Sequence, residues 1–144
     1  MSERQSSGGK VVADFMTRKI FTLKIDKKLI VAKEIMEWGH TRHVPVVNAA
    51  NEVVGMVSHR DLLVASIASN NKKISELERK QHLWTISVQE VLRSPVITIS
   101  PTASIQEAAC LLRRHKMGCL PVVENGKLVG IITDYDLLRA VEEL

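Results

Sequence analysis

The feature that most constrains this chain is an internal repeat. The segment HVPVV at residues 43–47 reappears as CLPVV at residues 119–123, which places Pro45 and Pro121 76 positions apart. Self-similarity at a fixed offset indicates that one supersecondary unit occurs more than once. We therefore expect two copies of a single structural unit.

The repeat extends well beyond these two segments. At the same offset, IFT at 20–22 aligns with VIT at 96–98, and AKEIM from Ala32 aligns with AACLL from Ala108. Further along, EVVGMVSHRDLL aligns with KLVGIITDYDLL at an offset of 75. The lost residue falls between NAANE and ENGK, which have the composition of a hairpin, and hairpins tolerate changes of length that strands do not.

Each copy is predicted to form the same series of elements. A short helical turn, at 12–16 or 88–92, leads to a strand around Phe21 or Ile97. An amphipathic helix follows, and then come two apolar strands and a second helix that starts at Ser58 or Thr133. The apolar residues with helical spacing are Leu29, Ala32, Ile35 and Met36 in the first copy, and Ile105, Ala108, Leu111 and Leu112 in the second.

The predicted fold class is mixed α/β (α+β), with two βαββα repeats. The expected boundaries are a flexible tail at 1–10, a first repeat at 11–68, a linker at 69–86 and a second repeat at 87–144. The linker has no counterpart after the second repeat. It is predicted to contain a helix, NKKISELERKQHL, with Ile74, Leu77, His82 and Leu83 as possible anchors on this chain or on another one.

Composition limits the classes of function. Charged residues make up 25% of the chain, and a net charge of +4 permits an anionic ligand. Aromatic residues make up only 3%, which leaves few platforms for stacking nucleic-acid bases. No apolar run approaches the ~20 residues that a membrane span needs, and residues 1–10 lack a hydrophobic signal core. We expect no membrane segment and a cytoplasmic protein.

Both repeats place a hydroxyl and a carboxylate where a strand gives way to a helix. The pairs are Ser58-x-x-Asp61 and Thr133-x-x-Asp136. A hydroxyl and free helix amides can donate to phosphate, and Asp can accept from ribose hydroxyls. The same spacing also describes a capping box, which only starts a helix, although Asp is shorter than the usual Glu and reaches back less well. The two roles are not exclusive.

The x-x-Pro-Val-Val strand and the Gly-φ-φ-[Ser/Thr]-x-x-Asp turn, where φ is apolar, each occur twice. In this combination the chain resembles a CBS-domain pair, or Bateman module. Its linker is similar to those of small stand-alone bacterial pairs of the acetoin-utilisation type. The resemblance implies two sheets about a pseudo-two-fold axis and a disk-shaped homodimer. It also implies clefts between the repeats that bind AMP, ADP, ATP, S-adenosyl-methionine or NAD.

The resemblance also implies which positions contact the ligand. Basic residues before the Pro strand touch phosphates in such pairs, and Arg42 and His43 hold these positions here. The second repeat departs from that pattern, because it has Gly118 and Cys119 there. Arg42 as a solvated side chain and His43 as strand-edge packing remain alternatives. The complete set of candidate nucleotide-binding residues is Thr133, Asp136, Ser58, Asp61, Arg42, His43, Ile20, Thr22, Val96, Thr98, Gly118 and Cys119.

These assignments predict an asymmetric module. Adenine is expected beside residues 20–22 or 96–98, on aliphatic contacts or backbone groups, although ordinary strand packing explains these residues equally well. The cleft with Thr133 and Asp136 is expected to borrow Arg42 and His43 from the other repeat and to bind more tightly. Asp134 counts against that ranking, because it adds a negative charge nearby.

Other chemistries receive little support. His40-x-x-His43 lacks the Cys or acidic partners of a metal site, and no recognisable nucleophile setting predicts an enzyme. Cys110 and Cys119 are expected to be reduced, buried thiols. The first hypothesis is a non-catalytic sensor of adenine nucleotides, a homodimer that acts on an enzyme or transporter in trans. The alternatives are a CBS scaffold for dimerisation or docking without nucleotide, and, third, a nucleic-acid binder.

Overall fold

The computed structural model describes residues 10–66, 75–92 and 96–144. The chain divides into two compact units, of which one comprises residues 1–20 and 97–144 and the other residues 21–96. We call them the flanking unit and the central unit. Residues 1–9 of the predicted flexible tail at 1–10 lie outside the described residues, as do the linker residues 69–74, which include the possible anchor Ile74.

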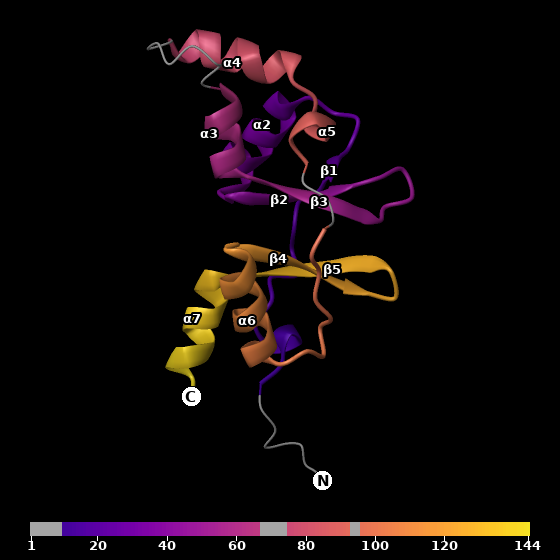
Figure 1. The fold of residues 1–144 in the computed structure, drawn as a ribbon, viewed down its shortest axis with the longest axis vertical. Coiled ribbons are helices and arrows are strands. Elements are labelled where there is room, and N and C mark those ends of the chain that lie inside the picture. The colour runs from indigo at the N-terminus through magenta and orange to yellow at the C-terminus, as the bar shows by residue number, and fades with distance from the viewer. Residues whose placement is uncertain (1–9, 67–74, 93–95) are drawn as a thin grey trace. The chain divides into compact units, whose positions relative to one another are not determined.

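The central unit is a three-stranded sheet with helices packed against it (Figure 1). The strands are β1 (Leu23–Lys24), β2 (His43–Val47) and β3 (Val53–Ser58), in the order β1-β2-β3. β1 runs parallel to β2, and β2 runs antiparallel to β3. Helix α2 (Leu29–Gly39) connects β1 to β2, and α3 (His59–Ser66) follows β3. The core joins Leu23, Leu29, Ile30, Val44, Val46, Val57 and Leu62.

The flanking unit repeats this plan. Strands β4 (Cys119–Glu124) and β5 (Lys127–Thr133) form an antiparallel hairpin. Helix α6 (Ile105–His115) precedes the hairpin and α7 (Asp134–Glu142) follows it. Its core joins Val12, Phe15, Ile99, Ala108, Leu112, Leu120, Val122 and Ile132.

The first strand of each repeat is shorter than predicted and begins later than the expected centres at Phe21 and Ile97. In the central unit the ladder begins at Leu23, which pairs with Val46, two residues after the predicted centre. Among the described residues of the flanking unit, the first strand forms one parallel bridge, between Ile99 and Val122. These two pairs occupy equivalent positions in the repeat, so both copies dock the first strand at the same point.

The short helical turns are exchanged between the repeats. The turn η1 (Val12–Asp14) begins the first repeat, yet it packs in the flanking unit, where the Val12 amide donates to the Ala103 carbonyl at 2.8 Å. Its counterpart α5 (Val88–Val91) packs in the central unit, where the Val88 amide donates to the Lys27 carbonyl, also at 2.8 Å. The compact units therefore divide the chain elsewhere than the sequence repeats do.

A glycine in each hairpin makes room for the residues beside an exchanged turn. A Cβ on Gly130 would lie 2.7 Å from the backbone oxygen of Thr17, which follows η1. A Cβ on Gly55 would lie 2.7 Å from a side-chain carbon of Leu92, which follows α5. A backbone oxygen held in a bridge yields less than the end of a flexible side chain, so the flanking unit is the less tolerant of the two.

The two repeats end their first long helix and turn their hairpin in the same backbone conformations. Both α2 and α6 end on a residue in the left-handed conformation, His40 at φ 52° and Lys116 at φ 55°. The hairpins turn through Asn51 and through Asn125, both at positive φ, where Asn is favoured. The first amide of α2, on Leu29, donates to a backbone oxygen at Ile86, so packing satisfies a helix start that has no side-chain cap.

The predicted linker helix is present as α4 (Glu76–Thr85), begun by a capping box at Ser75. It packs on the central unit of its own chain. Leu83 is 2% exposed in that core, and Nδ1 of His82 lies 3.1 Å from the Ser66 carbonyl oxygen at the end of α3. Leu77, a possible anchor, is 67% exposed and does not anchor the helix within this chain.

Candidate functional site

The two helix-start turns adopt the capping-box geometry. In the central unit, the Ser58 amide donates to Oδ2 of Asp61 at 2.8 Å, and the Asp61 amide donates to Oγ of Ser58 at 3.1 Å. In the flanking unit the matching distances between Thr133 and Asp136 are 2.9 and 3.2 Å. The expectation that Asp reaches back poorly was wrong, because the carboxylate closes the box at normal hydrogen-bond length in both copies.

The two carboxylates differ in their surroundings. Asp136 is 4% exposed, and its Oδ2 also accepts from the Thr133 hydroxyl at 3.0 Å. Nη2 of Arg139 lies 3.5 Å from Oδ1 of Asp136 and donates to the Phe15 carbonyl at 3.0 Å. Asp61 is only half-buried, and Val64 stands at the position equivalent to Arg139. The flanking carboxylate is therefore the more deeply buried of the two.

The central unit brings several candidate residues to one end of its sheet. His43 pairs directly with Ser58 across the ladder between β2 and β3. Arg42 precedes His43 and has an exposed side chain, and its carbonyl accepts from the first amide of α3, on His59, at 2.8 Å. Thr22, which is also exposed, leads into β1 on the other side of β2. A hydroxyl, a carboxylate and two basic side chains thus share this end of the unit.

The equivalent end of the flanking unit is not basic. Cys119 pairs with Thr133, and the amide of Asp134 donates to the Gly118 carbonyl at 3.0 Å. Burial raises the pKa of the Cys119 thiol far above its usual range, and the nearby carboxylates of Asp136 and Asp134 raise it further. The thiol therefore stays protonated and buried, as expected from the sequence. Thr98 is exposed one residue before the Ile99 bridge.

Ile20 and Val96, the two remaining candidates, lie at the ends of their units. Ile20 is the last residue of the first flanking segment, and Val96 is the last residue of the central unit. Both are half-buried. Their role in holding adenine stays a prediction.

An aromatic pair stands beside one of these predicted adenine positions. The rings of Phe21 and Trp38 meet edge to face with centroids 5.2 Å apart, and both are exposed, Trp38 to 75%. Phe21 occupies the space that a Cβ on Gly39 would need, at 2.6 Å. The expectation that adenine contacts would be aliphatic overlooked this pair, because the two residues lie 17 positions apart in no recognisable motif.

The central unit also contains a cavity of about 560 Å³ between α2, α3 and α4. Arg42 and His59 line it together with residues of α4 such as Arg79 and Leu83. Arg79 and Leu83 are four residues apart, and this spacing indicates that they lie on the same side of α4. The spacing does not indicate which other helices that side packs against. Sequence reasoning therefore missed this cavity.

The described residues contain neither a metal-ligand cluster nor a helix suited to span a membrane. Among residues 10–66, 75–92 and 96–144, no group of three or more His, Cys, Asp or Glu side chains is arranged to hold a metal ion. In the same ranges, no helix has the length and apolar character needed to cross a membrane.

Comparison with known proteins establishes the class. The family model described as the CBS domain matches twice, at residues 12–68 and 88–143. The chain therefore belongs to the CBS domain family and carries the domain as a tandem pair. This confirms the predicted fold of two βαββα repeats, and no catalytic family is matched.

Particular relatives refine this assignment. The structure of a protein from Vibrio cholerae assigned to acetoin utilization (AcuB) is 37% identical, with a TM-score of 0.74 over 94% of this chain and 93% of that one. It confirms the resemblance to the acetoin-utilisation type. The structure of CBSX2 in complex with AMP is 28% identical, with a TM-score of 0.77 over 94% of this chain and 99% of that one.

Curated relatives include both stand-alone and larger proteins. A CBS domain-containing protein of Dictyostelium discoideum is 29% identical over 133 residues, which are 89% of this chain and 88% of that protein. In several other relatives the match spans less than half of the relative's length. The activities of those whole proteins therefore do not transfer to this chain.

Proposed function

We propose that the chain is a regulatory module that binds an adenine nucleotide of the AMP, ADP or ATP class, or a related adenosine ligand such as S-adenosyl-methionine or NAD. The observation that carries this proposal is the pair of hydroxyl–carboxylate helix starts, Ser58 with Asp61 and Thr133 with Asp136. Further support comes from CBSX2, which is 28% identical over 94% of this chain and has been solved with AMP.

In this proposal the carboxylates hold the ribose. Each Asp uses Oδ2 to accept from the residue that starts its helix, Ser58 or Thr133. Oδ1 of Asp136 can then accept from a ribose hydroxyl while Arg139 stays close by. An ionised carboxylate makes stronger hydrogen bonds than a neutral acceptor, so these contacts contribute substantially to affinity.

The phosphate is assigned to the start of α3. Arg42 and His43 are basic, and they lie beside the N-terminal turn of α3, where helix amides lack an acceptor one turn earlier. At the start of α7 the amide of Tyr135 donates to Oδ1 of Asp134 at 2.8 Å, and His59 replaces that aspartate at the start of α3. An anion at α7 would meet the Asp134 carboxylate, whereas at α3 it meets the Arg42 guanidinium.

Adenine is assigned to residues 20–22 or 96–98, as the family resemblance implies. For residues 20–22, the pair of Phe21 and Trp38 adds an exposed aromatic surface. We retain the proposal that Arg42 and His43 serve the ligand held at Thr133 and Asp136, and that this ligand binds more tightly than one at Ser58 and Asp61. Glycine and a buried thiol at 118 and 119 supply no charge of their own.

The first test is calorimetry with AMP, ADP, ATP, S-adenosyl-methionine and NAD. Asp136→Asn keeps an oxygen that can accept from the Thr133 amide but removes the charge. We expect about 10- to 150-fold weaker binding, the equivalent of one charge-assisted hydrogen bond. Asp26→Asn is the matched control, because Asp26 is exposed and outside the site. Native affinity in both Asp136→Asn and Asp61→Asn would rule out the ribose contacts.

A double-mutant cycle tests the assignment of Arg42. Arg42→Ala is combined in turn with Asp136→Asn and with Asp61→Asn, and affinity for the best ligand of the panel is measured. If Arg42 serves the ligand at Asp136, the effects of that pair are non-additive and those of the other pair add. The opposite pattern would assign Arg42 to its own repeat and reject the borrowed contact.

The second candidate function is a scaffold for dimerisation or partner docking without nucleotide. It is favoured by the capping boxes, which account for both turns without a ligand, and by Leu63 and Leu138, equivalent residues of α3 and α7 that are 44% and 64% exposed. The test combines the ligand panel with light scattering. A stable dimer with no binding by any ligand selects the scaffold.

Both candidates share the remaining proposals. A homodimer is proposed in each case, with a regulated enzyme or transporter as a partner in trans. The cytoplasm is the proposed compartment, since adenine nucleotides are abundant there.

A further inference from the structure

The cavity of the central unit adjoins the start of α3, through Arg42 and His59, but does not include its capping box. Its volume of about 560 Å³ lies within the range of roughly 300 to 1,000 Å³ that is typical of small-molecule sites. Three helices form it, and α4 is the one that belongs to the linker. Neither Ser58 nor Asp61 lines it.

The inner part of the cavity is apolar. Met36 of α2, Leu62 of α3 and Leu83 of α4 line it and are each 5% exposed or less. Because they come from three different elements, an apolar group placed among them would contact all three helices. Burial of such a group contributes roughly 25 cal/mol per Å² of apolar surface.

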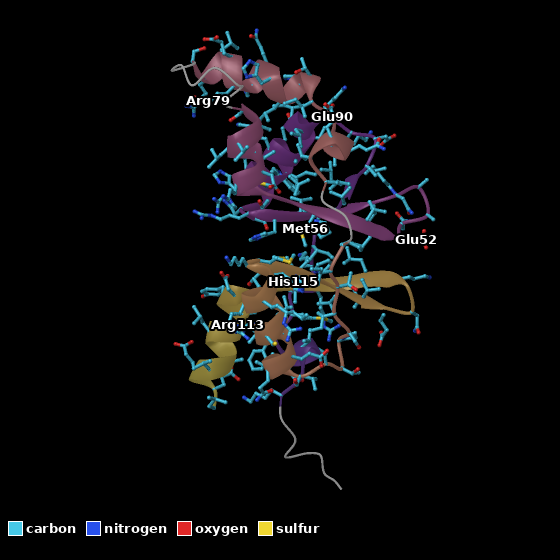
Figure 2. The ribbon with its side chains drawn as sticks, viewed as in Figure 1. Glu52, Met56, Arg79, Glu90, Arg113 and His115 are labelled. Atoms are coloured by element: carbon cyan, nitrogen blue, oxygen red, sulfur yellow. The ribbon has the colours of Figure 1, made fainter. Side chains whose placement is uncertain are left out.

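The charged residues of the cavity leave one cation in excess. Lys33, Arg42 and Arg79 are opposed by Glu37 and Glu76. Lys33 is already neutralised, because its Nζ lies 2.7 Å from Oε2 of Glu37, and this hydrogen bond holds the pKa of the Glu37 carboxyl below its usual range. Within the described part of the chain, Arg42 and Arg79 form no salt bridge. Figure 2 labels Arg79 on α4.

We infer that this cavity binds a small organic monoanion with an apolar body, such as a medium-chain carboxylate. The apolar body lies among Met36, Leu62 and Leu83, and the carboxylate is bound by Arg79 and Arg42. A guanidinium fork matches the two oxygens of a carboxylate. The inference goes beyond the proposed function, since it needs no nucleotide.

Ligand binding here would act on the linker helix. α4 is attached to α3 by the contact between His82 and Ser66 and by the burial of Leu83. A ligand that contacts both α4 and the α2–α3 pair adds to this attachment. Arg42 is shared with the proposed phosphate position, so an anion in the cavity competes with nucleotide phosphate for the same guanidinium.

The flanking unit provides a natural comparison. Lys33, Arg42 and His59 correspond to Ala109, Gly118 and Asp134 in the other repeat, and α4 has no counterpart there. The basic pair of Arg42 and His59 and the third wall are therefore specific to the central unit, although the flanking unit has Arg113 and Lys116 in place of Glu37 and His40.

The experiment compares three probes by calorimetry on the full chain. Octanoate carries both a charge and an apolar body, 1-octanol carries only the apolar body, and inorganic phosphate carries only the charge. We expect octanoate to bind with one site per chain, and each of the other two to bind at least about tenfold more weakly. Absence of octanoate binding, or equal binding of octanol, would overturn the inference.

Variants locate the site. Arg79→Ala is expected to weaken octanoate binding about tenfold or more, whereas Arg113→Ala, an exposed arginine on α6, leaves it unchanged (Figure 2). Leu63→Trp is expected to fill the cavity and abolish binding, and its repeat equivalent Leu138→Trp retains it. Hydrogen exchange should slow in α3 and α4 when octanoate binds. Unweakened binding to Arg79→Ala, or protection only outside α2–α4, would refute the site.

The outcome is separable from that of the nucleotide proposal. Arg79→Ala should leave AMP affinity as in the wild type, because Arg79 is not among the proposed nucleotide contacts. Octanoate binding without any AMP binding counts against the proposed function alone. AMP binding without octanoate binding counts against this inference alone.

Discussion

The central and flanking units share a backbone plan and differ in the chemistry around it. Both close a capping box at the start of the last helix, both end the preceding helix in the left-handed conformation, and both receive an exchanged turn. Around the helix start, however, the central unit has Arg42 and His59 where the flanking unit has Gly118 and Asp134. The shared features are those that the scaffold needs, so the differing side chains are where the two copies have become specialised.

The contrast extends to the carboxylates themselves. Asp136 is buried beside Arg139, whereas Asp61 is half-buried with Val64 at the corresponding place. The flanking unit thus has the more buried carboxylate, and the central unit has basic groups at its helix start.

The largest expected effect concerns the strand glycines. Gly130→Ala should lower the free energy of unfolding by about 3 kcal/mol, because the new methyl group meets the Thr17 backbone oxygen. Gly55→Ala should lower it by only about 1 kcal/mol, since the side chain of Leu92 can move. Urea denaturation followed by circular dichroism measures both. Equal losses would show that the two exchanged turns are held equally tightly.

A smaller difference is expected for the capping carboxylates. Asp136→Ala should destabilise by about 2 kcal/mol, because it removes a buried acceptor of two hydrogen bonds from Thr133 and leaves Arg139 without its carboxylate. Asp61→Ala should cost about 1 kcal/mol, as for a more exposed cap. Thermal unfolding without ligand gives both values. A larger loss at Asp61 would show that burial of the carboxylate does not determine the cost of removing it.

The smallest effect should be a gain in stability. Lys116→Gly and His40→Gly each replace a residue in the left-handed conformation, where a side chain is disfavoured and glycine is not. Each is expected to add about 0.5 to 1 kcal/mol to the free energy of unfolding, because relief of the left-handed strain exceeds the extra chain entropy that glycine loses on folding. Because the two positions are equivalent in the repeat, the gains should agree closely. A loss at either position would mean that its side chain makes a stabilising contact.

Most elements of the fold could be predicted from the sequence, because the patterns that indicate them involve neighbouring residues or occur in both repeats. Helical spacing in residues 29–36 and 105–112 predicted α2 and α6, and the paired apolar runs predicted β2 to β5. The extent of the first strands was not predictable, since pairing of Leu23 and Ile99 depends on β2 and β4. Nor was the exchange of η1 and α5, because each turn packs on the repeat that is distant in sequence.

The candidate site could be predicted only in part from the sequence. The Ser58 and Thr133 turns were found because their spacing occurs twice, and both adopt the geometry of a capping box. The salt bridge between Arg139 and Asp136 could not be predicted, because the Arg139 side chain is also bound by the carbonyl of Phe15, which is 124 residues away. The cavity depends on where α4 packs, and the polar linker sequence leaves that undetermined.

By itself, the sequence determined the duplicated plan, the family and the positions of the two hydroxyl–carboxylate turns. These depend on patterns of neighbouring residues and on a repeat that can be aligned. Only the tertiary structure decided which repeat each exchanged turn supports, how deeply each carboxylate is buried, and that α4 closes a cavity over α2 and α3. Those outcomes arise from packing between segments far apart in the chain, where many alternatives have similar local sequence and only the complete core selects one of them.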